Sequence, residues 1–350
     1  MKTGKSLVDL ATELQRQSES KKDYLADTRA VALVPTDHGV TLSGVNGGMS
    51  IKPLAHSQIA ETVGIPKPYY DRMLAEAPHL LATNVNEWFT RKPQRRLVRT
   101  LDNSVRAMLS DSYRPLDSYD LAEAVLPKLQ EMGARVISCD VTDRRFYLKA
   151  VTDRTEGIVK VGDTMQAGIA ISNSETGHGS LRVEALDFRL VCSNGLISEQ
   201  AVRKAHLGRS GGNLDAIEDA REFFRDETRE ADDRAFFLKV RDAVGSMFNQ
   251  ERFDKRLNKY REASELMIEA DPVKVVEATA KRLTLNKEEE SGVLKHLIRG
   301  GDLSLFGLVN AVTRLAEDVD SYDRSTELEA FGGRIMALPA RDWKSLATAV

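Results

Sequence analysis

The chain has 350 residues, of which 41% are hydrophobic, 29% charged and 6% aromatic, and this composition excludes disordered, collagen-like and small disulfide-stapled proteins. Its net charge of −3 argues against a polycation that coats nucleic acid indiscriminately. No window approaches the roughly 18 to 20 apolar residues needed to cross a bilayer, and the first 25 residues lack the apolar run of a signal peptide. We therefore expect a globular cytoplasmic protein with no membrane partner, whose length favours more than one structural unit.

The first unit is expected over residues 1–94. Residues 5–27 carry a narrow apolar stripe that predicts a surface helix. Short strands are expected at 30–34 and 40–42, followed by helical segments between 57 and 89 that glycine and proline interrupt. Residues 58–73 have the outline of two helices joined at a turn. Of the Arg, Asn and Gln residues that usually read base edges, however, the second helix has only Arg72. A simple helical hairpin is therefore favoured over a helix-turn-helix reader of DNA.

In the middle unit, residues 95–198, apolar and polar residues alternate with a period of two. Alternating residues on both sides of Asp102-Asn103 predict an antiparallel hairpin. A helix is expected over 117–132, and four strand-like runs follow it without intervening helices, at 135–141, 144–151, 165–172 and 181–192. This order predicts an α+β fold with a mainly antiparallel sheet and packed helices.

The third unit, residues 199–350, is predicted to be entirely helical because the β pattern ends after Asn194-Gly195. Glycine pairs at 300–301 and 332–333 are expected to break the helices. The helical segments that we expect after residue 270 are 272–285, 288–299, 303–319 and 341–349.

Metal and cofactor chemistry has little support in the sequence. Cys139 and Cys192 are the two cysteines, and they are too few for a thiolate zinc site without nearby histidines. No two of the six histidines stand three or four residues apart, as a ligand pair on one helix face requires. We therefore predict free thiols and no metal, cofactor or catalytic residue.

A polar, glycine-containing segment at 171–179 is a candidate ligand loop through Asn173, Ser174, Glu175 and His178. In an enzymatic interpretation, Glu175 and His178 act as an acid and base pair near Ser174, and Asp111 or Asp117 holds Mg²⁺. The competing interpretation is a β-turn in which Asn and Ser bond to their own backbone. We favour a structural or ligand-contact role over catalysis.

The most basic window is 91–106, where six cations accompany the single acid Asp102. Arginines on a strand present rigid donors to phosphate oxygens, and phosphate contacts supply most of the sequence-independent affinity for nucleic acid. Aromatic residues nearby, at 88, 89, 113 and 119, offer stacking faces for bases. The residues predicted to contact nucleic acid are Arg91, Lys92, Arg95, Arg96, Arg99, Arg106, Tyr113 and Arg114.

The sequence resembles the domain-of-unknown-function family 932, also called the phage/plasmid-like protein family. Three parts of the chain carry this resemblance: residues 97–117, residues 171–177 with 191–196, and residues 307–313 with 322–324. This resemblance implies a gene of phages, plasmids or integrated elements that acts in a bacterial cytoplasm, in replication, recombination or defence. The order of hairpin, helix and meander is also similar in outline to phage single-strand annealing proteins of the Red-beta and RecT types, which form rings or filaments. This second likeness concerns the fold alone.

Together these observations predict a non-enzymatic protein that binds or anneals single-stranded DNA as a homo-oligomer. Two alternatives remain at this stage. One is a metal-dependent nuclease or other hydrolase that uses Glu175 and His178, and the other is a regulatory interaction protein without affinity for DNA.

Overall fold

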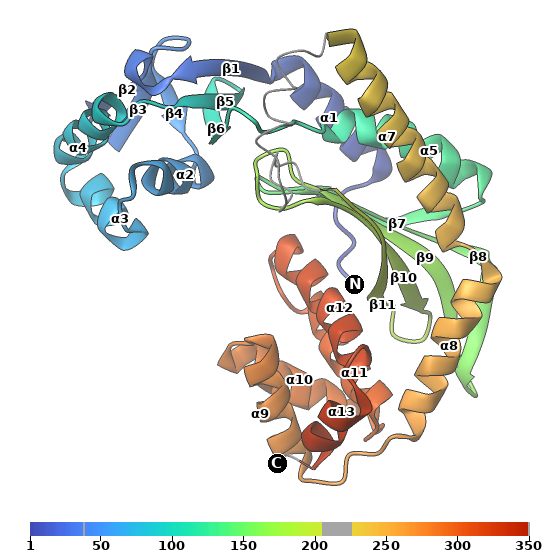
Figure 1. Ribbon diagram of the computed structural model, residues 1–350. Helices are drawn as coiled ribbons and strands as arrows, with labels where there is room; N and C mark the ends of the chain where they lie inside the picture. Colours follow the sequence, from blue (N-terminus) through green and yellow to red (C-terminus); the bar gives the residue numbers. More distant parts are fainter. Residues whose placement is uncertain (38, 205–225, 349–350) are drawn as a thin grey trace.

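The computed structural model describes residues 1–37, 39–204 and 226–348, which form two β-sheets flanked by helices (Figure 1). The fold is α+β, as the sequence predicted, and the region after residue 249 is helical. Among the described residues, no helix is long and apolar enough to cross a membrane.

The N-terminal sheet has six strands in the order β1-β5-β6-β4-β3-β2. All neighbours are antiparallel except β4 and β6. Residues 95–110, which the sequence analysis placed in the middle unit, are hydrogen-bonded into this sheet through β5 and β6. The strand bounds are β1 Lys22–Asp27, β2 Ala32–Thr36, β3 Gly39–Ser43, β4 Met49–Ile51, β5 Arg95–Leu101 and β6 Ser104–Ser110.

This sheet is strongly curved. Strands β1 and β2 are its two edges, yet only residues 28–31 separate them in the chain. A flat six-stranded sheet would place its edges about 24 Å apart, whereas the chain from Asp27 to Ala32 reaches at most about 18 Å. The edges must therefore curl toward each other around the apolar core.

The turn between β5 and β6 has the geometry that the sequence predicts. Asp102 and Asn103 both have positive φ, at 51° and 56°. Two successive left-handed residues are typical of the two-residue turn that matches the twist of a hairpin, and Asp and Asn tolerate this conformation best after Gly. The predicted hairpin is confirmed.

Three helices pack on the curved sheet, namely α2 Pro53–Val63, α3 Lys67–Glu76 and α4 Pro78–Arg91. The first helix, α1 Leu7–Ser20, instead buries Leu10 and Leu14 in the apolar cluster of the other sheet. The helix expected over residues 5–27 is too long, because α1 ends at Ser20 and the next residues pair with β5 as β1. In α4, the Asn86 side chain accepts a hydrogen bond from the Leu33 N–H at 2.8 Å and donates to the Leu33 carbonyl at 2.9 Å. This amide covers the open edge of β2.

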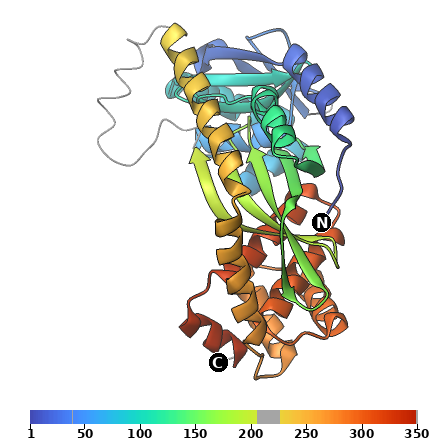
Figure 2. The same cartoon turned by 90° about the vertical axis from the view of Figure 1, so that its right-hand side faces the viewer.

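The central sheet is antiparallel throughout, in the order β11-β10-β9-β8-β7. One face packs against α5 and α7 in a shared apolar cluster, and α12 packs on β11 at the other side (Figures 1 and 2). The bounds are α5 Ser118–Glu131, β7 Arg135–Val141, β8 Phe146–Lys160, β9 Asp163–Asn173, β10 Leu181–Arg189, β11 Asn194–Lys204 and α7 Asp226–Met247.

The prediction that the helical region begins at residue 199 is wrong, because residues 199–204 belong to strand β11, which runs from Asn194 to Lys204. This strand lies at the sheet edge and pairs only with β10. Among the residues of β11 whose side chains the structure describes, the buried apolar ones are Leu196 and Ile197. The sequence that follows, at 198–204, shows little of the alternation by which strands are recognised. Partner β10 and the packing of α12 hold it in place.

The C-terminal helices share one large apolar cluster with the far end of the central sheet. The expected break at Gly332-Gly333 was wrong, because both glycines lie inside α12. A methyl group at Gly333 would lie 2.0 Å from the Ile197 carbonyl oxygen of β11, so glycine here permits close packing. The bounds are α8 Gln250–Glu265, α9 Pro272–Leu283, α10 Lys287–Gly300, α11 Leu305–Arg314, α12 Tyr322–Met336 and α13 Ala340–Ala347.

Candidate nucleic-acid interface

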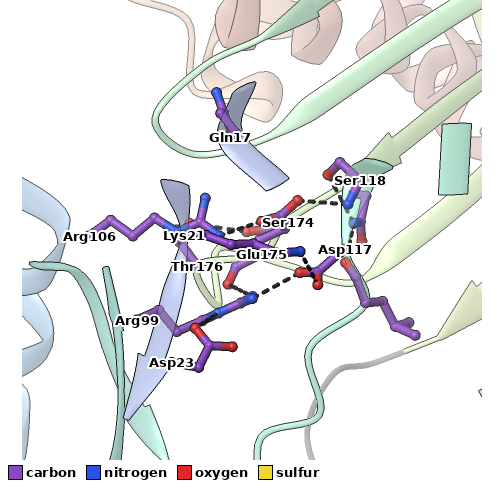
Figure 3. Close-up of polar contacts among 12 residues, drawn as sticks. Gln17, Lys21, Asp23, Arg99, Arg106, Asp117, Ser118, Ser174, Glu175 and Thr176 are labelled. Atoms are coloured by element: carbon purple, nitrogen blue, oxygen red, sulfur yellow. Dashed lines mark hydrogen bonds and ion pairs between the residues drawn. The ribbon is translucent and has the colours of Figure 1, made fainter. Parts of the chain in front are cut away.

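Arg99, at the centre of the predicted basic surface, is completely buried. Its guanidinium donates to the Asp23 carboxylate at 2.9 Å, to the Asp117 carboxylate at 2.8 Å and to the Glu175 carbonyl oxygen at 2.8 Å (Figure 3). A buried arginine with these partners is satisfied by the protein itself. In this arrangement Arg99 joins structural segments and presents no donor at the surface.

Arg106 is also held by an acid. Its side chain is mostly buried and forms an ion pair with the Glu175 carboxylate. That carboxylate accepts a further hydrogen bond from the Ser118 N–H at 2.6 Å, at the first residue of α5 (Figure 3). Glu175 therefore takes over the capping role that Asp117 would ordinarily fill, because the Asp117 side chain is bonded to Arg99 and Lys21.

The other predicted contacts lie in different surroundings. Tyr113 is buried and its hydroxyl donates to the Ser174 carbonyl at 2.9 Å, so its ring is not open to a base. Arg114 is half-buried. The stacking candidates Phe89 and Tyr119 are buried and half-buried respectively.

The remaining four cations lie where α4 ends and β5 begins, at the other end of β5 from the Asp102 turn. Arg91 pairs with Glu87 at 2.6 Å, and the Lys92 ammonium lies 5.3 Å from the ring centre of Trp88. Arg95 is exposed, while Arg96 is half-buried and donates to Gln94. The structure thus does not gather the predicted residues on one surface.

The 171–179 segment acts as a structural connector. Asn173 is buried and donates to the Leu116 carbonyl at 2.7 Å. The buried Ser174 hydroxyl donates to the Arg144 carbonyl at 2.9 Å and accepts from the His178 N–H at 2.9 Å. With Glu175 engaged as above, only His178 of the four predicted residues is exposed.

No group of three or more metal-ligating side chains is found in the described parts of the chain. Asp117, one of the two carboxylates considered for Mg²⁺, is committed to Arg99 and Lys21. Asp111 is exposed on the β6–α5 connection. The two cysteines form no disulfide with each other.

A cleft of about 550 Å³ opens between the N-terminal unit and the β7–β8 turn of the central sheet. Its walls come from α1, the start of α2, the β5–β6 turn, residues 141–144 and His178.

Partial burial and the charges of Arg144 and Arg145 lower the pKa of His178, so this imidazole is neutral near pH 7. Three carboxylates line the cleft, namely Glu13, Asp102 and Asp143. Five cations line it as well, namely Arg16, Lys52, Lys67, Arg106 and Arg144.

Two of these five cations differ from the rest. Lys52 and Arg144 are exposed, and neither forms an ion pair within the described residues. Arg16, Lys67 and Arg106 each pair with a carboxylate of the protein. The uncompensated positive charge of the cleft therefore comes from opposite walls, one in the N-terminal unit and one in the central sheet.

Sequence reasoning did not find this cleft. Of its five cations, only Arg106 was among the predicted contacts, and the others come from three separate helical regions and one turn. None of these other four cations lies in the basic window, so no local sequence pattern identifies them. Only the folding of the N-terminal unit against the central sheet brings them together.

The arrangement is that of an α+β protein with a cationic cleft between two sheets. A family model described as "Domain of unknown function (DUF932)" matches residues 108–314, more than half of the chain. The protein belongs to this family, as the strings quoted above indicated. No curated protein and no solved structure gives a significant match.

Proposed function

We propose that this protein binds a single strand of DNA by its phosphates, without cleaving it, in the cleft between its two sheets. The observation that carries the proposal is the position of Lys52 and Arg144, two exposed cations without an acid partner among the described residues, on opposite walls of one cleft. Cations so placed attract a polyanion and release its counterions when it binds.

The size of the cleft favours one strand over a duplex. Its volume of about 550 Å³ is in the range of sites that enclose small ligands, roughly 300 to 1,000 Å³, and suits a short stretch of single strand. Recognition by phosphate contacts implies little dependence on base sequence. In this respect the proposal differs from a reader of duplex DNA.

The proposed binding site is therefore the cleft, whereas the sequence alone pointed to the basic window. Arg99 and Arg106 serve the fold through Asp117 and Glu175. Arg91, Lys92 and Arg95 are exposed at the far end of β5 and can add phosphate contacts along the path of a longer strand. We propose that the protein works in this way in the cytoplasm, in replication or recombination of a mobile element.

The test is fluorescence anisotropy with a labelled single-stranded oligonucleotide over a series of salt concentrations. We expect the double variant K52E/R144E to lose most of the affinity and to lower the slope of log K against log salt by about 1.4, because each phosphate contact to a single strand contributes about 0.7. The matched control is K274E/R299E, which makes the same change of charge at two exposed residues of α9 and α10. Absent binding, binding that ignores salt, or equal losses in both variants would reject the proposal.

Self-association is the second part of the proposal. Annealing requires that two strands are held near each other, which a homo-oligomer with one cleft per subunit achieves. The mass in solution, measured with and without the oligonucleotide, tests this part. We expect an assembly that grows on DNA, and a monomer under both conditions would reject annealing while leaving strand binding intact.

A further inference from the structure

One carboxylate inside the cleft is surrounded by groups that would equally hold a phosphate. The Asp102 carboxylate accepts hydrogen bonds from the Arg16 guanidinium at 2.7 Å and from the Ser20 hydroxyl at 2.7 Å. The positive charge of Lys52 acts on the same carboxylate, and together these three groups lower the pKa of Asp102. Two donors of α1 thus meet at a single anionic position, and Lys52, at the N-cap of α2, adds a positive charge without contacting it.

Arg16 is prepared for a ligand of this kind. Its Nε and Nη2 atoms donate to the two oxygens of Glu13, each at 2.8 Å, which fixes the plane of the guanidinium. The remaining Nη1 atom points to Asp102. A guanidinium held in this way offers a planar donor to an oxyanion, as arginines do where phosphates are recognised.

Asp102 is easily displaced. Its side chain is half exposed and so is that of Arg16, and exposed ion pairs contribute little to stability. The residue lies in a two-residue turn, away from the apolar core. A phosphate of a bound strand, which carries a full charge and is one of many along the strand, competes effectively with such a carboxylate.

We propose that the position of the Asp102 carboxylate is a phosphodiester subsite, which a strand phosphate enters by displacing Asp102 from Arg16 and Ser20, with the charge of Lys52 nearby. This inference rests on the proposed function and adds two points to it. It places one phosphate of the strand, and it identifies the Arg16–Asp102 ion pair as an internal contact that competes with binding. Displacement exchanges one ion pair for another, and no covalent bond changes.

Asp143 provides the matched comparison. It lines the same cleft and carries the same charge, but it is exposed and forms no ion pair among the described residues. Removing either carboxylate makes the cleft more positive by one charge. Only removal of Asp102 also frees the Nη1 atom of Arg16, so the difference between the two variants isolates the subsite.

The experiment compares D102N and D143N in the anisotropy assay. Asn tolerates the left-handed conformation at residue 102, so D102N is expected to fold, and a thermal melt verifies this. We expect D102N to bind the oligonucleotide about 2- to 5-fold more tightly than D143N at low salt, a gain that corresponds to one exposed ion pair. We also expect R16Q to weaken binding more in the D102N background than in the unaltered protein.

Two results would overturn the subsite. One is equal affinity of D102N and D143N, and the other is an R16Q effect that is the same in both backgrounds. If the unaltered protein binds with the expected salt dependence in that case, strand binding stands and only the subsite is rejected. If neither the unaltered protein nor D102N binds the oligonucleotide, both proposals are rejected together.

Discussion

The Arg99 guanidinium donates to the Asp117 carboxylate at 2.8 Å, and this buried ion pair joins the two halves of the molecule. Arg99 belongs to β5 of the N-terminal sheet, and Asp117 precedes α5, which packs on the central sheet. A second pair, Arg106 with Glu175, makes a similar connection (Figure 3). Two of the six cations in the most basic window of the sequence, Arg99 and Arg106, therefore connect the two units.

Replacing Arg99 by Ala tests this structural role. The change removes the arginine partner of Asp23 and leaves Asp117 with Lys21 alone. We expect it to cost about 3 to 5 kcal/mol of unfolding free energy, as when one member of a buried pair is removed. The control is Arg95→Ala on the same strand, where the exposed side chain predicts a change within about 0.5 kcal/mol. Urea unfolding measures both, and similar stability of the two variants would contradict the assignment.

Gly333 is predicted to resist the substitution that normally strengthens a helix. Gly to Ala inside a helix stabilises by about 1 kcal/mol, but here the added methyl group would meet the Ile197 carbonyl oxygen at 2.0 Å. We expect Gly333→Ala to destabilise by roughly 1 to 3 kcal/mol through overpacking. Gly300→Ala, at the end of α10 with open space around it, should be neutral or stabilising. A melting temperature that rises for Gly333→Ala would show that α12 does not pack on β11 this closely.

His56 should make stability depend on pH. It is buried in α2, with its Nδ1 atom 2.9 Å from the Tyr70 hydroxyl oxygen. Burial, with a smaller contribution from Lys67, lowers its pKa from 6.5 to about 4. Because the unfolded chain binds the proton more readily, the contribution to stability is full above pH 6.5 and is lost as the pH falls toward 4.

Between pH 7 and pH 5 this single residue is expected to cost about 2 kcal/mol. In His56→Gln the corresponding part of the pH dependence should be absent, whatever the absolute stability of the variant. Unfolding in urea at both pH values measures the difference. An unchanged pH dependence in His56→Gln would show that other groups cause it.

Local signals predicted the fold better than they predicted the site. The β5–β6 hairpin was predictable because Asp102 and Asn103 favour the turn by themselves. Strand β11 was not, because it depends on its neighbours β10 and α12. Alternation along β5 placed arginines on faces of a strand, but it could not show that Arg99 would lie opposite two acids from remote segments.

The cleft was unpredictable for a related reason. Lys52 and Arg144 are 92 positions apart in the numbering of the chain, and each is unremarkable among its neighbours. Their juxtaposition depends on how the two sheets are fastened, which involves Glu175 and Asp117 as much as any basic residue. A search of the sequence for basic runs therefore finds the arginines that connect the two sheets but does not find the cleft.

The curved sheet also has a consequence for the order of events during synthesis. Strand β1 has β5 as its only partner in the sheet, and β4 needs β6 on one side. Neither strand can therefore complete its hydrogen bonds before the hairpin at 95–110 has been made. Contacts between such distant positions slow folding. On the ribosome, β1 is thus synthesised well before its partner and stays unpaired while more than 70 further residues, 28 to 101, leave the exit tunnel.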